Sequence, residues 1–149
     1  KMKEKDIKKA LQEREKGTLT LLRNNTYNLI LKMSIAALHQ ALRQRTWNHI
    51  PESIYSALDR FEYIIPPSIK KSKFNDEYNF MVKKLYKTYI RLVNEGYPYY
   101  DAIGIISHSH IVYDLIRIDG WNILSTIPIR RCLKAQWEIR FISSGIANE

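Results

Sequence analysis

The sequence predicts an all-α protein, and three observations favour this fold class. The chain of 149 residues contains 5 Gly and 5 Pro, so long helices can run without interruption. Apolar residues make up 45% and charged residues 26%, as in an ordinary globular domain. Apolar side chains also recur at steps of three and four over long stretches. We therefore expect about five to seven helices in antiparallel hairpins, arranged as a bundle or a short α-solenoid.

The N-terminal part, residues 1–17, carries charges of both signs and a thin apolar stripe. This pattern predicts a solvated helix that could protrude. Residues 18–149 are then expected to form a single helical domain, because a chain of this length supports one hydrophobic core. The chain starts at Lys1 rather than at Met, so it could also be a piece of a larger protein.

A first helical hairpin is expected in the next part of the chain. The apolar pattern that starts at Leu19 predicts a helix of about 25 residues ending near Arg45. Its stripe consists of Tyr27, Ile30, Leu31, Ile35, Leu38 and Leu42. Pro51 favours the start of a second helix, because its fixed φ angle suits a first helical turn. Trp47 is expected in the corner between these two helices.

A further helix is predicted after a basic loop that covers residues 64–75. Asn75 is a suitable N-cap, and Asp76 and Glu77 would lie in the first turn, near the positive end of the helix dipole. Gly96 lies where a glycine commonly ends a helix. The stripe between them contains Tyr78, Met81, Val82, Leu85, Tyr89, Leu92 and Val93.

The last third of the chain predicts shorter elements. We expect helices near residues 98–107, 109–118 and 126–142, with a turn at Asp119-Gly120. Apolar and polar residues alternate over residues 137–142, so a short strand there competes with the helix, which we favour.

Charge and cysteine usage narrow the class of function. A formal net charge of +9 attracts phosphate-rich or acidic partners. The single cysteine, Cys132, cannot form an intrachain disulfide, which favours an intracellular protein of the cytoplasm or nucleus. No apolar run is long enough for a membrane helix, so no membrane partner is expected. Glycine-rich phosphate loops and paired metal-ligand clusters are missing from the sequence, so we expect no cofactor and no metal.

The most distinctive local feature is a basic stretch interleaved with aromatic residues. Lys83, Lys87 and Arg91 are spaced by four and share one helix face. We predict that these cations bind phosphates or carboxylates, together with a secondary C-terminal cluster. The full predicted set is Lys70, Lys71, Lys73, Lys83, Lys84, Lys87, Arg91, Arg130, Arg131 and Lys134.

We therefore predict a non-catalytic basic helical module that contacts RNA or DNA within a larger assembly. Its expected partners are nucleic acid or an acidic protein surface, and other protein subunits. A helix-turn-helix over residues 99–117 is less favoured, because Gly104 would fall inside its first helix instead of in the turn. No catalytic residue is assigned on this interpretation.

Two alternatives belong to other classes of function. The first is a protein–protein scaffold with an exposed apolar patch around Tyr97, Tyr99 and Tyr100. The second is a metal-independent ribonuclease that uses Arg43 and His49, whose spacing is similar to the R-x(4–6)-H signature of HEPN-type ribonucleases. The composition of the chain produces about one such match by chance, and Pro51 places His49 at a helix break.

Overall fold

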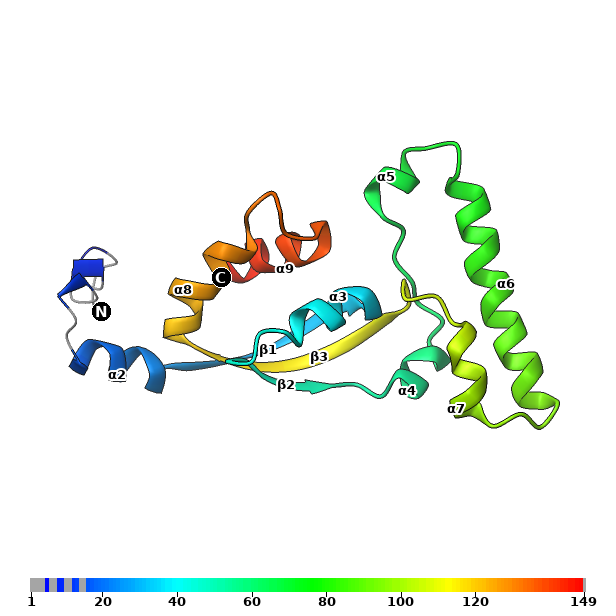
Figure 1. Ribbon diagram of the computed structural model, residues 1–149, viewed down its shortest axis with the longest axis horizontal. Helices are drawn as coiled ribbons and strands as arrows, with labels where there is room; N and C mark the ends of the chain where they lie inside the picture. Colours follow the sequence, from blue (N-terminus) through cyan, green and yellow to red (C-terminus); the bar gives the residue numbers. More distant parts are fainter. Residues whose placement is uncertain (1–4, 6–7, 10–11, 14–15, 149) are drawn as a thin grey trace. The chain divides into compact units, whose positions relative to one another are not determined.

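The protein combines α-helices with a three-stranded sheet, so the prediction of an all-α fold is wrong (Figure 1). The computed structural model describes residues 5, 8–9, 12–13 and 16–148. The strands are β1 (Thr26–Ser34), β2 (Asn48–Pro51) and β3 (Ile111–Asp119), in the spatial order β1-β3-β2. The helices are α2 (Lys16–Asn24), α3 (Ile35–Ala41), α4 (Ile54–Asp59), α5 (Pro67–Lys70), α6 (Asn75–Asn94), α7 (Tyr99–Ala102), the 3-10 turn η1 (Ile103–Ile105), α8 (Gly120–Arg130) and α9 (Trp137–Asn148).

Strand β1 replaces the centre of the long helix expected from Leu19 to Arg45. Leu31 and Met33 are buried while Ile30 and Lys32 are exposed, which is the alternation of a strand. The apolar residues spaced by three and four, which suggested a helix, therefore also fit a strand in which only a few alternating residues are buried. Pairing with β3, which is distant in sequence, decides between the two.

Strand β3 lies where a short helix over residues 109–118 was expected, so that prediction is also wrong. The buried residues alternate with more exposed ones from Val112 to Ile118, and Asp114 faces inward among the apolar side chains. Strand β2 pairs with it antiparallel, with His49 opposite Ile116 and Pro51 opposite Asp114. The corner expected between two helices is thus a loop that leads into a strand.

Helix α6 confirms the helix predicted after the basic loop. It begins at Asn75, one residue earlier than expected because Phe74 holds the N-cap position, and Asp76 and Glu77 occupy its first turn. Gly96 follows with a φ angle of 93°, the left-handed conformation that glycine adopts readily at a helix end. Residues 137–142 lie in α9, so the competing strand there is wrong, but the helix predicted over residues 126–142 is interrupted between Arg130 and Trp137 and forms parts of α8 and α9.

The chain divides into two compact units. Unit 1 consists of residues 1–31, 39–51 and 114–149, and unit 2 of residues 32–38 and 52–113. Most of the charged N-terminal helix predicted over residues 1–17 lies outside the described residues.

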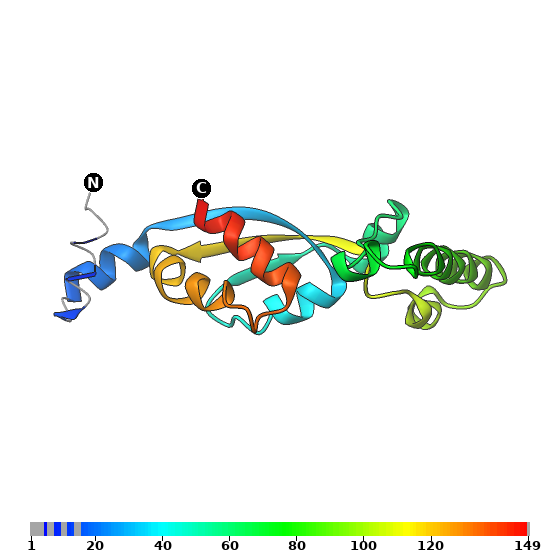
Figure 2. The same cartoon turned by 90° about the horizontal axis from the view of Figure 1, so that it is seen from above.

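In unit 1, α8 and α9 cover one face of the sheet (Figures 1 and 2). The buried apolar side chains of this unit are Leu31, Ala41, Trp47, Ile116, Ile118, Ile127 and Ile139. Residues that alternate with them along the strands, including Ile30, Ile50 and Leu115, are exposed. Strands β1 and β3 therefore each contribute alternating buried residues to the core of this unit.

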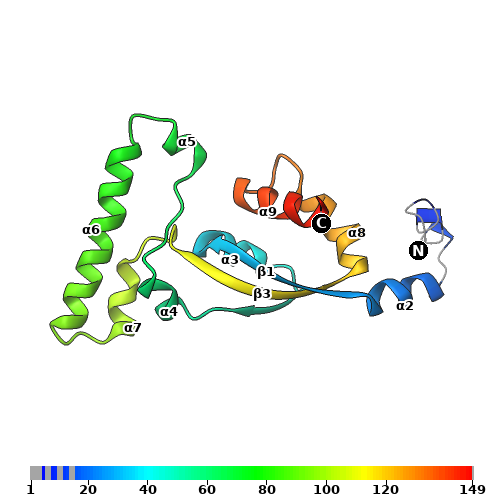
Figure 3. The same cartoon turned by 180° about the vertical axis from the view of Figure 1, so that it is seen from behind.

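In unit 2, α6 packs against α7 and η1 (Figure 3). The core of this packing consists of Leu58, Tyr89, Ala102 and Ile106, with Tyr86, Leu92 and Val93 among the partly buried neighbours. The opposite side of α6 faces solvent, and it carries several of the predicted cations. Over the described part of the chain, no helix is both long and apolar enough to cross a membrane.

Candidate functional site

A loop between α3 and β2 presents two arginines to solvent. The backbone turns tightly after α3, because the amide of Gln44 donates to the carbonyl of Ala41 over 2.8 Å and the amide of Trp47 to that of Gln44 over 3.0 Å. These turns leave Arg43 and Arg45 exposed and bury Trp47. The tryptophan therefore anchors the loop in the core of unit 1 while the flanking arginines remain accessible.

A buried asparagine ties this loop to α8. The Thr46 hydroxyl donates to Oδ1 of Asn122 over 2.6 Å, and Nδ2 of Asn122 lies 3.4 Å from the Thr46 carbonyl. The same Nδ2 donates to Oδ1 of Asp119 over 2.7 Å, which also caps α8 through the Asn122 amide. Because Asn122 is buried and all these bonds converge on it, the loop is held in a fixed position on α8.

A second link joins the loop to the far end of α8. When the Gln44 amide is oriented with its oxygen toward Arg130, it accepts hydrogen bonds from Nη2 and from Nε of that guanidinium, the latter over 2.8 Å. Arg130 ends α8 and Arg131 is its C-cap residue. We call Arg43, Arg45, Arg130 and Arg131 the arginine corner.

Among the described residues, the arginine corner has no acidic partner. In the described part of the chain, no carboxylate lies within ion-pair distance of its guanidiniums. Guanidiniums bind phosphates and carboxylates in planar, two-pronged geometry, and unpaired ones attract anions. The chemistry of this corner is therefore that of an anion site.

Beside the loop, a buried histidine pairs with a buried carboxylate. Nδ1 of His49 lies 2.6 Å from Oδ2 of Asp114, and the Trp47 ring stacks on the imidazole at a centroid distance of 5.9 Å. Three buried polar atoms of this group have no hydrogen-bond partner among the described residues: Nε1 of Trp47, Nε2 of His49 and Oδ1 of Asp114. In native proteins such atoms normally bind ordered water or a ligand.

Unit 2 contains an ion pair of a different character. Arg60 makes a bidentate contact with Glu52, in which Nη2 lies 2.7 Å from Oε2, and the Tyr113 amide donates to the same oxygen over 3.1 Å. The guanidinium also lies over the Tyr113 ring, 4.8 Å from its centroid. The hydrogen-bonding groups of Arg60, Glu52 and Tyr113 are thus partners of one another. The Arg60 guanidinium also holds the pKa of Glu52 below its ordinary value. We interpret this pair as structural.

His110 is enclosed by aromatic rings in the same unit. It is fully buried beside Phe61, Tyr63 and Tyr86, with ring centroids 5.7 to 6.4 Å away. Burial lowers its pKa, partly offset by the nearby Glu62 carbonyl, which already accepts from the Ile111 amide. His110 is therefore a core residue of unit 2.

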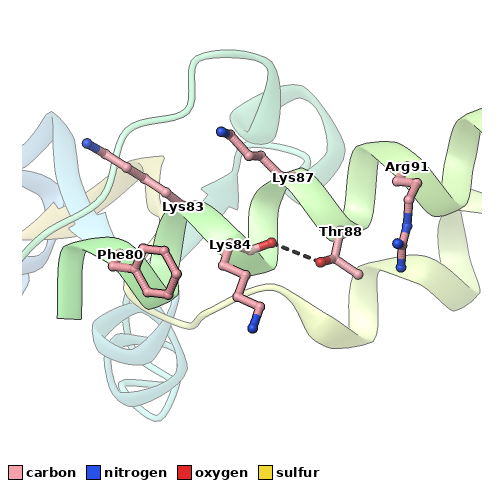
Figure 4. A pocket seen from close by; sticks show the side chains of 6 residues that line it. All are labelled: Phe80, Lys83, Lys84, Lys87, Thr88 and Arg91. Atoms are coloured by element: carbon pink, nitrogen blue, oxygen red, sulfur yellow. Dashed lines mark hydrogen bonds between the residues drawn. The ribbon is translucent and has the colours of Figure 1, made fainter. Parts of the chain in front are cut away.

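The predicted binding residues fall into separate groups. Lys83, Lys84, Lys87 and Arg91 line one groove on α6 together with Phe80 and Thr88 (Figure 4). Lys70 ends α5, Lys71 is its C-cap and Lys73 lies over the Phe74 ring, so these three lysines do not line that groove. Arg130, Arg131 and Lys134 belong to unit 1. Whether any of these cations binds a ligand stays a prediction.

Sequence reasoning missed Asp114 and Asn122 as site residues. Asp114 is an inward-facing carboxylate in a strand that was interpreted as a helix, and the alternation from Val112 to Ile118 was the signal that could have revealed it. Asn122 follows the Asp119-Gly120 pair, which was taken as a turn and is in fact the capped start of α8. Asp119 at this N-cap was the available signal for that helix.

Comparison with known proteins gives a consistent result. The family model described as thymidylate synthase complementing protein matches residues 1–149. A flavin-dependent thymidylate synthase from Saccharolobus solfataricus is 29% identical over 137 residues, which cover 89% of this chain and 52% of that protein. Proteins of the same name from Sulfurisphaera tokodaii and Sulfolobus acidocaldarius are 27% and 24% identical, and the matches cover 53% and 52% of their lengths. The chain thus spans about half the length of the curated relatives it matches.

These matches overturn the functional prediction from the sequence. The module without catalysis, the scaffold and the Arg43–His49 ribonuclease are all contradicted, because the relatives are named as enzymes that make thymidylate. The net positive charge misled the interpretation, since a basic balance indicates attraction to anions in general and does not identify nucleic acid as the partner. His49 moreover lies in strand β2 and is hydrogen-bonded to Asp114, whereas Arg43 lies in an exposed loop. Because the family model matches every residue, the chain belongs to the thymidylate synthase complementing protein family.

Proposed function

We propose that this chain forms part of a flavin-dependent thymidylate synthase and that its arginine corner binds a phosphate of the nucleotide or of the flavin. The observation that carries the proposal is that the loop bearing Arg43 and Arg45 is tied to α8 by the Thr46–Asn122 hydrogen bonds, with Gln44 beside Arg130 at the end of that helix. The names of the relatives supply the ligand classes, a pyrimidine nucleotide and a flavin.

The phosphate of thymidylate suits this corner chemically. It is a multiply charged anion with several acceptor oxygens, and guanidiniums bind such groups through paired charge-assisted hydrogen bonds. Arg43 and Arg45 are exposed, so their five N–H donors each remain accessible to a ligand. With its amide oriented so that the oxygen faces Arg130, the Gln44 side chain orients that guanidinium.

The residues at the end of α8 also fit a flavin. A flavin nucleotide combines a phosphate with a planar aromatic ring, which needs an apolar surface. Ile129 and Leu133 flank the arginines of this segment and are 66% and 87% exposed, so they offer such a surface beside the cations. Arg130 and Arg131 would hold the flavin phosphate there, and the bound flavin would supply hydride chemistry.

Phosphate-dependent binding tests the proposal with two matched ligand pairs. Thymidylate is compared with thymidine, and flavin mononucleotide with riboflavin, by isothermal titration calorimetry on the purified protein and its Arg45→Gln variant. Losing a charge-assisted contact should weaken binding of a phosphorylated ligand about tenfold or more. The ligands without phosphate should bind the variant and the parent protein equally well.

Arg23→Gln is the matched control, because Arg23 is an exposed arginine of the same unit at the end of α2. It should leave all four affinities unchanged. Equal loss in Arg23→Gln and Arg45→Gln, or equal loss for thymidine and thymidylate, would contradict phosphate recognition by the arginine corner.

A further inference from the structure

We propose that the solvent-facing side of α6 binds an acidic, partly apolar helical segment of a partner protein. The surface consists of Phe80, Lys83, Lys84, Lys87, Thr88 and Arg91, which we call the basic groove (Figure 4). This interaction surface is independent of the proposed nucleotide and flavin site, and it belongs to unit 2.

Two columns of side chains border the basic groove. Phe80, Lys84 and Thr88 follow one another at steps of four, and Lys83, Lys87 and Arg91 do the same. The columns project from successive turns of α6 and enclose a depression of about 320 Å³ (Figure 4). Along the helix axis, the second column spans about 12 Å, with one cation per roughly 6 Å.

Within the part of the chain that the structure describes, the charge of this surface is largely uncompensated. Lys83, Lys84 and Lys87 are exposed, and in the described part of the chain none of them lies within ion-pair distance of a carboxylate. Arg91 lies 3.8 Å from Glu95, and both of these side chains are more than half exposed. Such an exposed pair contributes little energy, so Arg91 remains available to a stronger anionic partner.

An apolar group accompanies these cations. The Phe80 side chain is 62% exposed at one end of the groove, and the aliphatic stems of the lysines line its walls. A purely ionic ligand would leave the phenyl ring in water. An amphipathic acidic helix would cover it, because carboxylates four residues apart repeat at the same spacing as the cations and apolar residues lie beside them.

A protein helix fits this groove better than a nucleic acid does. A phosphate backbone needs a continuous basic track, whereas the cations of this groove stand beside a phenylalanine and a threonine. Lys70 and Lys71 lie at the end of α5 and Lys73 lies over Phe74, none of them lining the groove. The surface is therefore short, mixed in character and matched to a few carboxylates.

Binding of a defined peptide tests the proposal. The probe is a fluorescent helical peptide with glutamates at every fourth position and leucines beside them, and binding is followed by anisotropy at low and physiological salt. A second peptide carries glutamine in place of every glutamate. Because each exposed ion pair contributes modestly, the triple variant Lys83→Gln, Lys87→Gln, Arg91→Gln should bind the acidic peptide roughly tenfold more weakly.

The matched control removes the same charge elsewhere in unit 2. The triple variant Lys70→Gln, Lys71→Gln, Lys73→Gln also loses three cations, and it should bind the acidic peptide like the parent protein. Phe80→Ala tests the apolar contact separately: it should weaken binding of the leucine peptide and leave binding of an equally acidic peptide with serines unchanged. Circular dichroism verifies that all variants are folded.

Three outcomes would overturn the proposal. The first is equal loss in both triple variants, which would indicate a response to net charge alone. The second is absence of binding to the acidic peptide at low salt. The third is tighter binding of single-stranded RNA of equal charge, lost in the groove variant, which would assign the surface to nucleic acid.

Discussion

Nδ1 of His49 lies 2.6 Å from Oδ2 of Asp114, and less than a tenth of either side chain is exposed. The two residues come from β2 and β3, which pair with each other, so the contact joins neighbouring strands of unit 1. Asp114 fixes the orientation of the imidazole, and Nε2 is buried without a hydrogen-bond partner among the described residues.

Asp114→Asn should destabilise the protein. The amide is a weaker acceptor than the carboxylate, and a hydrogen bond to a charged group contributes about 1.5–3 kcal/mol. We therefore expect the free energy of unfolding to fall by about 2 kcal/mol in urea denaturation at neutral pH. Glu95→Gln, which removes an exposed carboxylate on unit 2, should change it by less than about 0.5 kcal/mol.

A double-mutant cycle separates the pair from its surroundings. If the His49–Asp114 contact causes the loss of stability, the double variant should lose less free energy of unfolding than the sum of the losses in His49→Gln and Asp114→Asn. Simple additivity of the two losses would mean that each residue is stabilised by other neighbours.

The sequence predicts an element well when local contacts determine its structure, and poorly when contacts with distant residues do. Helix α6 was predictable because its acidic first turn, its apolar stripe and Gly96 are all local signals. Strands β1 and β3 were not, because their pairing partners are distant in sequence and a short alternating segment also fits helical steps. The Ile-Val-rich composition of β3 was the available signal for a strand.

The sequence revealed the residue types of the candidate site but not which of these residues lie close together. Arg43, Arg45 and Arg130 were recognised as cations, but nothing local brings residues 44 and 130 together. Only the packing of α8 beside the loop makes the Gln44–Arg130 link possible. The strongest local charge pattern instead directed attention to α6, in the other unit.

Burial of His110 should make the stability of the protein depend on pH. Its pKa is lowered in the folded state, so below the ordinary histidine pKa the unfolded chain binds a proton more readily than the folded one. Stability is therefore highest above that pKa and falls as the pH decreases from about 6.5. Chemical denaturation at a series of pH values from neutral to mildly acidic measures this slope.

His110→Phe should flatten the slope in that range, because phenylalanine does not titrate and suits the surrounding rings of Phe61, Tyr63 and Tyr86. Tyr86→Phe is the control, since it alters the same cluster without removing a group that titrates near neutral pH. An unchanged slope in His110→Phe would show that another group causes the pH dependence.

The Glu52–Arg60 pair should stabilise the protein at neutral pH and lose its effect in acid. The pKa of Glu52 is lowered in the folded state, so its contribution is fully present above the unfolded pKa of about 4.3 and disappears as the pH falls through the folded value. Glu52→Gln should cost about 1–2 kcal/mol at pH 7, and the difference from the parent protein should shrink below about pH 4.

Arg60→Lys provides the comparison for the same pair. Lysine keeps the charge but cannot make the bidentate contact, so it should recover part of the stability that Arg60→Gln loses. Equal losses in Arg60→Lys and Arg60→Gln would mean that the planar guanidinium, stacked on Tyr113, matters more than its charge.

Gly120 should not tolerate a side chain, because α2 approaches it closely at the start of α8. A Cβ atom there would lie 3.0 Å from the carbonyl oxygen of Leu22, and the Gly120 amide donates to the Asn25 carbonyl over 2.9 Å. The close neighbour is backbone, so it cannot rotate away. We expect Gly120→Ala to lower the melting temperature and to cost about 1–3 kcal/mol.

Gly145→Ala is the matched control within α9. A Cβ atom at Gly145 meets no atom within 4 Å, and the residue lies inside a helix where alanine is favoured. This variant should therefore stabilise the protein by about 0.5–1 kcal/mol. If Gly120→Ala were equally stabilising, α2 would have to move away from α8 at little cost, and the contact between Leu22 and Gly120 would not fix how α2 packs in unit 1.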